Sequence, residues 1–339
     1  MGSHGGGTAE GQRKILEEYG VTQDGVGAEI RAGMKTVHLG TTSEGFATYM
    51  DRNAWEADAV VVINRVKPHT DFVGKVESGL LKMMAVGMGK VDGAQEMHRW
   101  ARRHGRERVI RSMADRVMAT GKILVGLALV ENEFHEICVV RAARPEDIAA
   151  REEAALELAR TLVPRIPFAE FQLLIVGQIG KNISGTGMDT KIVGRGVTIP
   201  PGQAPGIDLI YVRDLTPESN GNATGVGLAD LVHERLHRKV DWEYTFLNVR
   251  TALTPILARL PMHLPSDHEA LDLALRVAGS PEPENQRIIW IRDTLSLNRI
   301  AVSEALALNA VSLQNWQLLP EHLPLQFDCE ENFNSFGAN

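Results

Sequence analysis

The sequence predicts an α/β fold: two α/β domains with mainly parallel sheets and a cleft between them. Short, continuous apolar runs recur along the chain, as is typical of strands that are buried on both faces. Helical patterns separate these runs, and such alternation favours parallel sheets. At 339 residues, the chain is long enough to bury a sizeable core in each of two domains.

The predicted elements follow from these patterns in chain order. The strands are Ala59–Asn64, Lys122–Val130, Gln172–Val176, Ile207–Val212 and Arg287–Ile291. The helices are Thr8–Tyr19, Glu77–Val86, Pro145–Leu162, Leu228–Val240 and Asp267–Val277. Thr8 has the side chain of a helix cap, and Pro145 stands at a first helical position with acidic residues after it.

A domain boundary is expected at Val163–Phe168, where two prolines end a helix before a new strand. This gives an N-terminal domain of residues 1–166, a C-terminal domain of residues 167–325 and a tail of residues 326–339. The polar segment Asp328–Asn339 is expected to fray.

Composition narrows the classes of partner. A net charge of −7 and a pI of about 5.9 argue against nucleic acid or an anionic membrane. The two cysteines, Cys138 and Cys329, give no disulfide framework and fit a reducing compartment. No apolar run approaches the ~20 residues that span a bilayer, and the N-terminus lacks a signal peptide. We therefore expect a cytoplasmic protein.

The residues most suggestive of chemistry follow the first predicted strand. Pro68-His69 comes directly after it, Lys82 lies in the next helical pattern, and His98 follows sixteen residues later. A further histidine, His4, stands in a glycine-rich start. Three imidazoles and an amine near a loop at a strand end suggest a metal site or a covalent-cofactor site.

Ser78 and Gly79 precede the lysine at the expected helix start, where backbone N–H groups could bind an anion. The alternative is purely structural. In that case Lys82 is a solvated helix lysine and His69 a polar loop residue.

The order of these residues resembles the nickel-pincer-nucleotide-dependent lactate racemase family. The matching pattern is Gly-x-His, then Pro-His, then Ser-Gly-x-x-Lys-x-x-x-x-Gly, then a histidine sixteen residues after the lysine. The resemblance covers most of the chain and implies a site in the cleft between two α/β domains. It implies a pyridinium-3,5-bisthiocarboxylic acid mononucleotide nickel cofactor, attached to Lys82 by separate biosynthetic enzymes. It also implies that His98 binds nickel and that His4 and His69 are the catalytic acid/base pair.

The function implied is that of an isomerase, a racemase or epimerase of a 2-hydroxy acid, acting by reversible hydride transfer to the cofactor. The substrate is a lactate-like acid or a sugar acid. The chain departs from the family at the insertion-like Gly74–Glu77 and at Gly79-Leu80-Leu81 before the lysine, so the substrate need not be lactate.

The family's carboxylate-binding arginine lies upstream of its first catalytic histidine. We therefore expect an incomplete N-terminal domain with weak activity, unless Arg65 or Arg195 replaces that arginine. One alternative is that Met1–His4 remains from a purification tag. Another is a non-catalytic family member that binds a small acid or nothing.

The second half offers a glycine-rich loop, Ile179–Asp189, after a predicted strand. Its glycine spacing fits neither a Walker loop nor a dinucleotide fingerprint. The resemblance implies that Lys181, Asp189 and Arg195 contact the substrate, whereas the structural alternative is a tight connection with Asp189 as a cap. A second loop of this kind is Ser219–Gly227.

A competing motif is His233-Glu234-Arg235-Leu236-His237, which matches H-E-x-x-H. On a helix, His233 and His237 would share a face and Glu234 could activate a zinc-bound water. The neighbouring positive charges disfavour this zinc hydrolase. Candidates for a third ligand, among them His263, have no convincing spacing.

Overall fold

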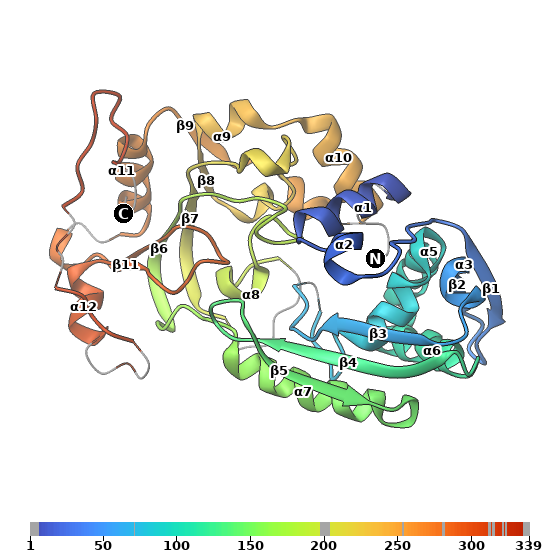
Figure 1. Ribbon diagram of the computed structural model, residues 1–339. Coiled ribbons are helices and arrows are strands. Elements are labelled where there is room, and N and C mark those ends of the chain that lie inside the picture. The colour runs from blue at the N-terminus through green and yellow to red at the C-terminus, as the bar shows by residue number, and fades with distance from the viewer. Residues whose placement is uncertain are drawn as a thin grey trace. The chain divides into compact units, whose positions relative to one another are not determined.

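The computed structural model describes residues 7–70, 72–196, 204–252, 254–279, 282–310, 313, 316–320, 322 and 324–334. It confirms the predicted α/β class, with helices packed on largely parallel sheets. The chain divides into two compact units, Met1–Val163 and Pro164–Asn339, coloured blue to green and green to red in Figure 1. In its described part, no helix is both long and apolar enough to cross a membrane.

The sheet of the first unit is built on the first predicted strand. Among the described residues, β3 (Val60–Arg65) runs parallel to β4 (Ile123–Glu131), and β4 pairs antiparallel with β5 (Ile137–Ala143). A separate antiparallel hairpin consists of β1 (Thr36–Thr41) and β2 (Ala47–Asp51). The carboxyl end of β3 leads directly into the loop that carries His69.

The helices of the first unit bury the apolar side chains of one face of this sheet. Val62 and Ala128 of the sheet belong to the same core as Met113 and Leu156 of the helices. The helices are α1 (Ala9–Glu18), α2 (Gln23–Val26), α3 (Arg52–Glu56), α4 (Leu80–Lys82), α5 (Lys90–His104), α6 (Arg106–Met118) and α7 (Ile148–Leu162). A π-helical turn, Met83–Gly87, joins α4 to α5, and a 3-10 turn, Pro145–Asp147, precedes α7. Thr8 caps α1 as predicted, accepting the Gly11 N–H at 3.0 Å.

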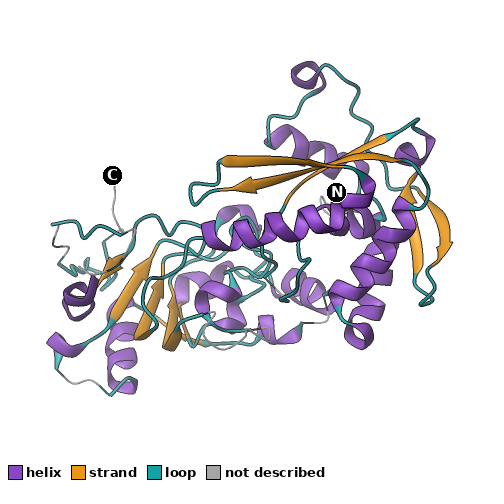
Figure 2. Cartoon of the chain, turned by 90° about the horizontal axis from the view of Figure 1, so that it is seen from below, coloured by secondary structure: helices purple, strands orange, loops and turns teal. Residues whose placement is uncertain are grey.

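The second unit is a larger sheet, seen as a separate set of strands in Figure 2. Within the described residues its strand order is β11-β10-β6-β7-β8-β9, and β10, β6, β7, β8 and β9 are parallel. The strands are β6 (Glu170–Val176), β7 (Gly206–Val212), β8 (Leu231–His233), β9 (Met262–Leu264), β10 (Ile288–Ile291) and β11 (Ala301–Val302). The chain runs from β6 outward to β9 and then returns to the other side of β6. The switch point of this topology therefore lies between β6 and β10.

Both faces of this sheet are buried, which explains why its strands are continuously apolar. Leu174 and Val176 pack in one cluster, whereas Leu173 and Ile175 pack in the cluster on the opposite face. The helices are α8 (Thr190–Val193), α9 (Glu234–Lys239), α10 (Trp242–Thr251), α11 (Asp267–Val277) and α12 (Glu304–Ala310). Short 3-10 turns are Pro217–Ser219, Val226–Leu228, Pro255–Ala258 and Pro283–Asn285.

Two sequence-based expectations are wrong. The predicted helix Leu228–Val240 contains a strand, β8, because Leu231 and Val232 pair with β7 and β9 before the helix begins at Glu234. The end of the chain does not fray over its described part up to residue 334. Phe333 is 5% exposed, packs on Trp290 and donates its N–H to a buried carboxylate, so burial and hydrogen bonding hold this segment.

Candidate functional site

The loop that carries His69 is folded around a buried carboxylate. Lys67 and Ser78 pair in an antiparallel bridge, which closes the loop. Glu77 is fully buried, and its carboxylate accepts the backbone N–H of His69. Arg160 of α7 forms an ion pair with Glu77 at 2.7 Å, as a buried charge requires. The backbone at His69 is therefore tied, through Glu77, to a helix of the core.

The segment Gly74–Glu77, which departs from the racemase pattern, packs against the same helices. Val76 is fully buried. The N–H of Lys75 donates to Glu107 of α6 at 3.0 Å, and Arg160 donates to the carbonyl of Gly74. Residues 74–77 thus support the His69 loop.

The side chain of His69 belongs to a small stacked group. Its ring lies against Phe72, with centroids 4.7 Å apart. The guanidinium of Arg106 lies 5.8 Å from the centroid of the same Phe72 ring. Phe72 and Arg106 also line a cavity of about 780 Å³. A solute in this cavity would therefore meet an aromatic ring and a guanidinium, and the same ring contacts His69.

Lys82 ends a short helix whose start is capped from α7. The helix begins later than predicted, because Ser78 is held in the bridge and its N–H donates to the Lys67 carbonyl at 3.3 Å. The Leu81 N–H donates to a carboxylate oxygen of Glu152 at 2.8 Å. The place expected for a bound anion at this helix start is therefore taken by a carboxylate of the chain itself.

The close approach of Glu152 explains the glycine that precedes the helix. A Cβ at Gly79 would lie 2.5 Å from the Glu152 carboxyl carbon. Glu152 is fully buried, and burial raises the pKa of its carboxyl to about 7, although hydrogen bonds from the backbone of Leu81 and Leu80 lower it. The Glu152 carboxyl, which takes up a proton near neutral pH, is thus hydrogen-bonded to the helix that carries Lys82.

The π-helical turn follows Lys82 directly and brings α5 close to it. A Cβ at Gly89 or Gly93 would lie 2.5 or 2.6 Å from the Ala85 carbonyl oxygen, so only glycine permits this approach. Single π-turns within helices often occur at functional sites. Here the turn joins the helix that ends in Lys82 to the helix that carries His98.

His98 is half-buried on α5 between two positive charges. Burial lowers the pKa of His98, and the charges of Arg106 and Lys82 lower it further. All three factors favour the neutral imidazole, whose nitrogen lone pair can bind a metal. Three of the residues predicted for the site, His69, Lys82 and His98, thus lie on consecutive segments of the first unit. His4 lies outside the described residues.

Sequence reasoning missed Arg106. The signal that could have identified it is the Gly105-Arg106 junction, where Gly105 has a φ of 83° and separates two helices. A glycine in this conformation ends α5, and Arg106 becomes the first residue of α6. The break turns the arginine toward Phe72 and into the electrostatic environment of His98.

In the second unit, the loop after β6 is a polar cluster that surrounds Lys181. The ammonium donates to the Gly185 carbonyl at 2.7 Å and to Asn248 Oδ1 at 2.9 Å. The hydroxyl of Thr224, from the loop after β7, shares the same Asn248 oxygen at 2.7 Å. Burial lowers the pKa of Lys181. The amine therefore stands beside the switch point of the sheet, where open α/β sheets bind ligands.

The other predicted contacts have structural partners. Asp189 caps α8 by accepting the Lys191 N–H at 2.8 Å. Arg195 pairs with Asp230 and donates to three backbone carbonyls, those of Leu228, Ile207 and Asp208. Arg65, the other candidate for a carboxylate, pairs with Glu131 at 2.9 Å.

The helical H-E-x-x-H geometry is not formed. His233 is the last residue of β8 and caps α9, so it does not share a helix face with His237. Its Nδ1 accepts the Arg235 N–H at 2.9 Å, and its Nε2 contacts Asn332 at 2.6 Å. Both ring nitrogens are therefore engaged. Among the described residues, no three His, Cys, Asp or Glu side chains gather in a way that could hold a metal.

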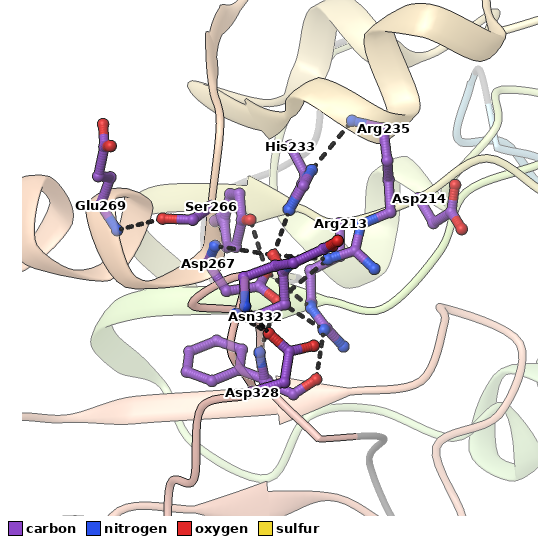
Figure 3. Close-up of polar contacts among 12 residues, drawn as sticks. Arg213, Asp214, His233, Arg235, Ser266, Asp267, Glu269, Asp328 and Asn332 are labelled. Atoms are coloured by element: carbon purple, nitrogen blue, oxygen red, sulfur yellow. Dashed lines mark hydrogen bonds and ion pairs between the residues drawn. The ribbon is translucent and has the colours of Figure 1, made fainter.

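The polar cluster in Figure 3 explains why this histidine is buried. Asp267, which follows β9, accepts from Arg213 at 2.6 and 2.9 Å and from Arg235 at 3.2 Å. Burial would raise the pKa of Asp267, but the Arg213 guanidinium holds it below its ordinary value. Asn332 bridges His233 and Arg235. The cluster links the end of the chain to the carboxyl ends of three strands and is a structural network in which Nε of Arg235 is buried without a hydrogen-bond partner.

Comparisons with known proteins give a distant likeness to solved structures. No protein-family model matches the chain, and a search of curated proteins finds no match. Among solved structures, the lactate racemase apoprotein from Thermoanaerobacterium thermosaccharolyticum is similar, with 16% identity and a TM-score of 0.46. The alignment covers 84% of this chain and 74% of that one. The likeness concerns the fold alone.

Proposed function

We propose that the chain is an isomerase that racemises or epimerises a 2-hydroxy acid, lactate-like or a sugar acid, with a nickel pincer nucleotide as its cofactor. The observation that carries the proposal is the path of the chain from Lys82 to His98: one π-helical turn joins the helix that ends in Lys82 to the helix that carries His98. Gly89 and Gly93 permit the close approach of these segments.

These two side chains suit such a cofactor in kind. The Lys82 amine would hold the nucleotide covalently, and the neutral His98 imidazole would be the protein's ligand to nickel. The cofactor would supply a hydride acceptor, a function that no protein side chain provides. Ser78 has less support as a cofactor contact, since its N–H is used in the bridge to Lys67. Gly79 would contribute by allowing Glu152 to cap the lysine helix.

The protein's own part in the reaction is proton transfer. Removal of a hydride from the 2-carbon and a proton from the hydroxyl leaves a planar 2-keto acid, to which both can return on either face. One base for each enantiomer is then needed, and an imidazole titrates in the right range. We assign these roles to His69 and His4. The stacking of His69 on Phe72 and the anchoring of its backbone to Glu77 support a fixed position for the first of them.

Lys181, Asp189 and Arg195 are the proposed substrate contacts in the second unit. Lys181 has the best support, because its amine is polar, partly buried and next to the switch point of the sheet. Asp189 and Arg195 already serve as a helix cap and as a clamp on backbone carbonyls.

The test is interconversion of stereoisomers by protein that has been co-expressed with the cofactor-building enzymes. Single enantiomers of lactate and single epimers of sugar acids are incubated with it and separated by chiral chromatography. A racemase brings either enantiomer of its substrate to the same equal mixture. Lys82→Ala and His98→Ala should abolish this conversion, and His69→Ala should slow it by about 10²–10⁴-fold.

Lys75→Ala is the matched control. Lys75 is an exposed lysine of the loop that carries His69, and it contributes a hydrogen bond through its backbone N–H. It should retain activity. If loaded protein converts none of these acids, or if Lys82→Ala converts one as fast as the wild type, the proposed function is wrong.

A further inference from the structure

The first unit contains a guanidinium placed to receive an acid. We infer that Arg106 binds the carboxylate of the substrate, next to His69 and His98. The inference rests on the proposed function and names the residue that selects an acid as the substrate. Arg106 lies over Phe72, the ring that also packs against His69.

The position of Arg106 fits a binding role. It is the first residue of α6, half-buried, and it lines the cavity of about 780 Å³ together with Phe72. Stacking on an aromatic ring leaves the edge of a guanidinium, where its N–H groups are, to meet a planar partner. A carboxylate accepts two parallel hydrogen bonds from that edge, which fixes its orientation as well as its position.

The cavity carries charges of both signs, because Glu44, Glu107 and Asp115 line it together with Arg106, Arg108 and Arg111. Glu44 is paired with Arg108, and Glu107 is paired with Arg111. A carboxylate bound here would gain attraction from the Arg106 charge at short range, in a partly buried setting where salt screens less. The hydroxyl carbon of a 2-hydroxy acid is one bond from its carboxylate, so in this arrangement it would lie close to Phe72, the ring that contacts His69.

Arg111 lines the same cavity and is bound by Glu107 and Glu153 at 2.8 and 2.5 Å. Arg106 is distinguished from it by its place over Phe72, the ring that contacts His69.

The experiment titrates the cofactor-free full chain with four named probes: D-lactate, L-lactate, D-gluconate and the neutral isostere lactamide. The readout is the ¹H–¹⁵N signal of the Arg106 Nε–H group, assigned by its loss in Arg106→Lys. Both lactates, or gluconate, should shift this signal in a saturable manner, and lactamide should not. A bidentate carboxylate contact predicts this difference, whereas a merely structural role for Arg106 predicts no shift.

Affinity and turnover supply the second arm. Arg106→Met should weaken binding of the acid at least 10-fold, and Arg106→Lys should weaken it less, since a lysine keeps the charge but not the fork. In cofactor-loaded protein, Arg106→Met should raise KM about 10–100-fold while kcat changes less. Arg103→Met is the control, because Arg103 is an exposed arginine near the end of α5 and does not line the cavity. Circular dichroism checks that each variant is folded.

The outcomes separate this inference from the proposed function. An unshifted Arg106 signal with every acid, equal binding of lactamide and lactate, or an unchanged KM in Arg106→Met would overturn the role of Arg106, even if the loaded enzyme isomerises its substrate. Acid binding that depends on Arg106, in a protein whose loaded form isomerises nothing, would support the role of Arg106 and refute the isomerase.

Discussion

At the scale of single residues, Glu152 shows how a buried charge can be recognised in a sequence. It lies on α7 four positions after Ile148 and four before Leu156, and both of these are fully buried. A glutamate on the apolar stripe of a helix indicates a buried carboxyl. The other glutamates of this helix lie off the stripe. Its partner could not be predicted, since the N–H of Leu81 comes from a distant part of the chain.

The raised pKa of Glu152 predicts a pH-dependent stability. Its carboxyl titrates at about 4.5 in the unfolded chain and at about 7 in the folded protein, so the folded state binds the proton more tightly. Its contribution to stability is complete below pH 4.5 and is lost as the pH rises through 7. The loss amounts to about 3 kcal/mol, at roughly 1.4 kcal/mol per pKa unit.

Glu152→Gln should remove this dependence, because an amide keeps the shape and the acceptor but does not ionise. Urea unfolding of both proteins from pH 4.5 to 8 measures it, and the difference between them should grow in favour of the variant as the pH rises. Glu157→Gln, which removes an exposed ion pair with Arg160 on the same helix, is the control and should leave the slope as in the wild type. Parallel curves for wild type and Glu152→Gln would refute the linkage.

The charge of Lys82 predicts a change in the titration of His98. Burial and two positive charges lower the pKa of this imidazole. Lys82→Met removes one of the charges, so the pKa of His98 should rise toward its ordinary value while burial still holds it below. Titration of the His98 ring proton by NMR in the cofactor-free protein measures this shift. An unchanged pKa would mean that the two side chains are not close, whereas Lys75→Met should leave it unchanged in either case.

At the scale of elements, long apolar runs were predictable and short segments were not. The five predicted strands all form, because continuous apolar runs of this length favour strands. The expectation that such runs are buried on both faces holds for β6 but not for β3, where Val61 and Ile63 are 47% and 54% exposed. The strand β8 has three residues, and its pairing with β7 and β9 overrides the helical pattern around it. The helix that ends in Lys82 likewise begins later than predicted, because Ser78 pairs with Lys67 in a bridge. No local sequence pattern predicts this bridge.

The two glycine-rich loops of the second unit, Ile179–Asp189 and Ser219–Gly227, pack backbone against backbone. One of their glycines is therefore required for stability, whereas another is not. Gly225 has a φ of 103°, and a Cβ there would lie 1.8 Å from the Thr186 carbonyl oxygen. Gly225→Ala should therefore cost about 2–5 kcal/mol, from backbone strain and overpacking together. Gly185, in the same loop as Thr186, would direct a Cβ into open space.

Gly185→Ala should change stability by no more than about 0.5 kcal/mol. Thermal unfolding of both variants is the measurement. Equal melting temperatures for Gly225→Ala and Gly185→Ala would contradict this packing of the two loops.

At the scale of the whole molecule, the chain consists of two units that each bury their own core. Val62 and Leu156 belong to the core of the first unit, and Leu174 and Ile210 belong to that of the second. Residues 7–163 and 164–334, expressed separately, should each unfold cooperatively, because a domain with its own core can fold alone. Circular dichroism during heating measures this. A unit without a cooperative transition would show that its core depends on the other.

The candidate site was predictable in its residue types but not in its supports. The spacing of Pro68-His69, Lys82 and His98 predicts a site, because a strand end followed by an amine and imidazoles is typical of covalent-cofactor or metal chemistry. Arg106 and Glu77 were not predicted. Each acts through a contact with a residue that is remote in the chain or through a loop conformation, and neither leaves a periodic pattern.

We propose that Lys82 is the attachment point of a nickel-bearing nucleotide that His98 also binds. The most direct test is peptide mass spectrometry, with nickel analysis, of the full chain co-expressed with the cofactor-building enzymes. We expect a nucleotide adduct on the peptide that contains Lys82, nickel in proportion to the adduct, and loss of both in Lys82→Ala. In His98→Ala, the adduct should remain and the nickel should fall. An adduct on a different lysine, or protein without any adduct under conditions that load a known racemase, would contradict the account.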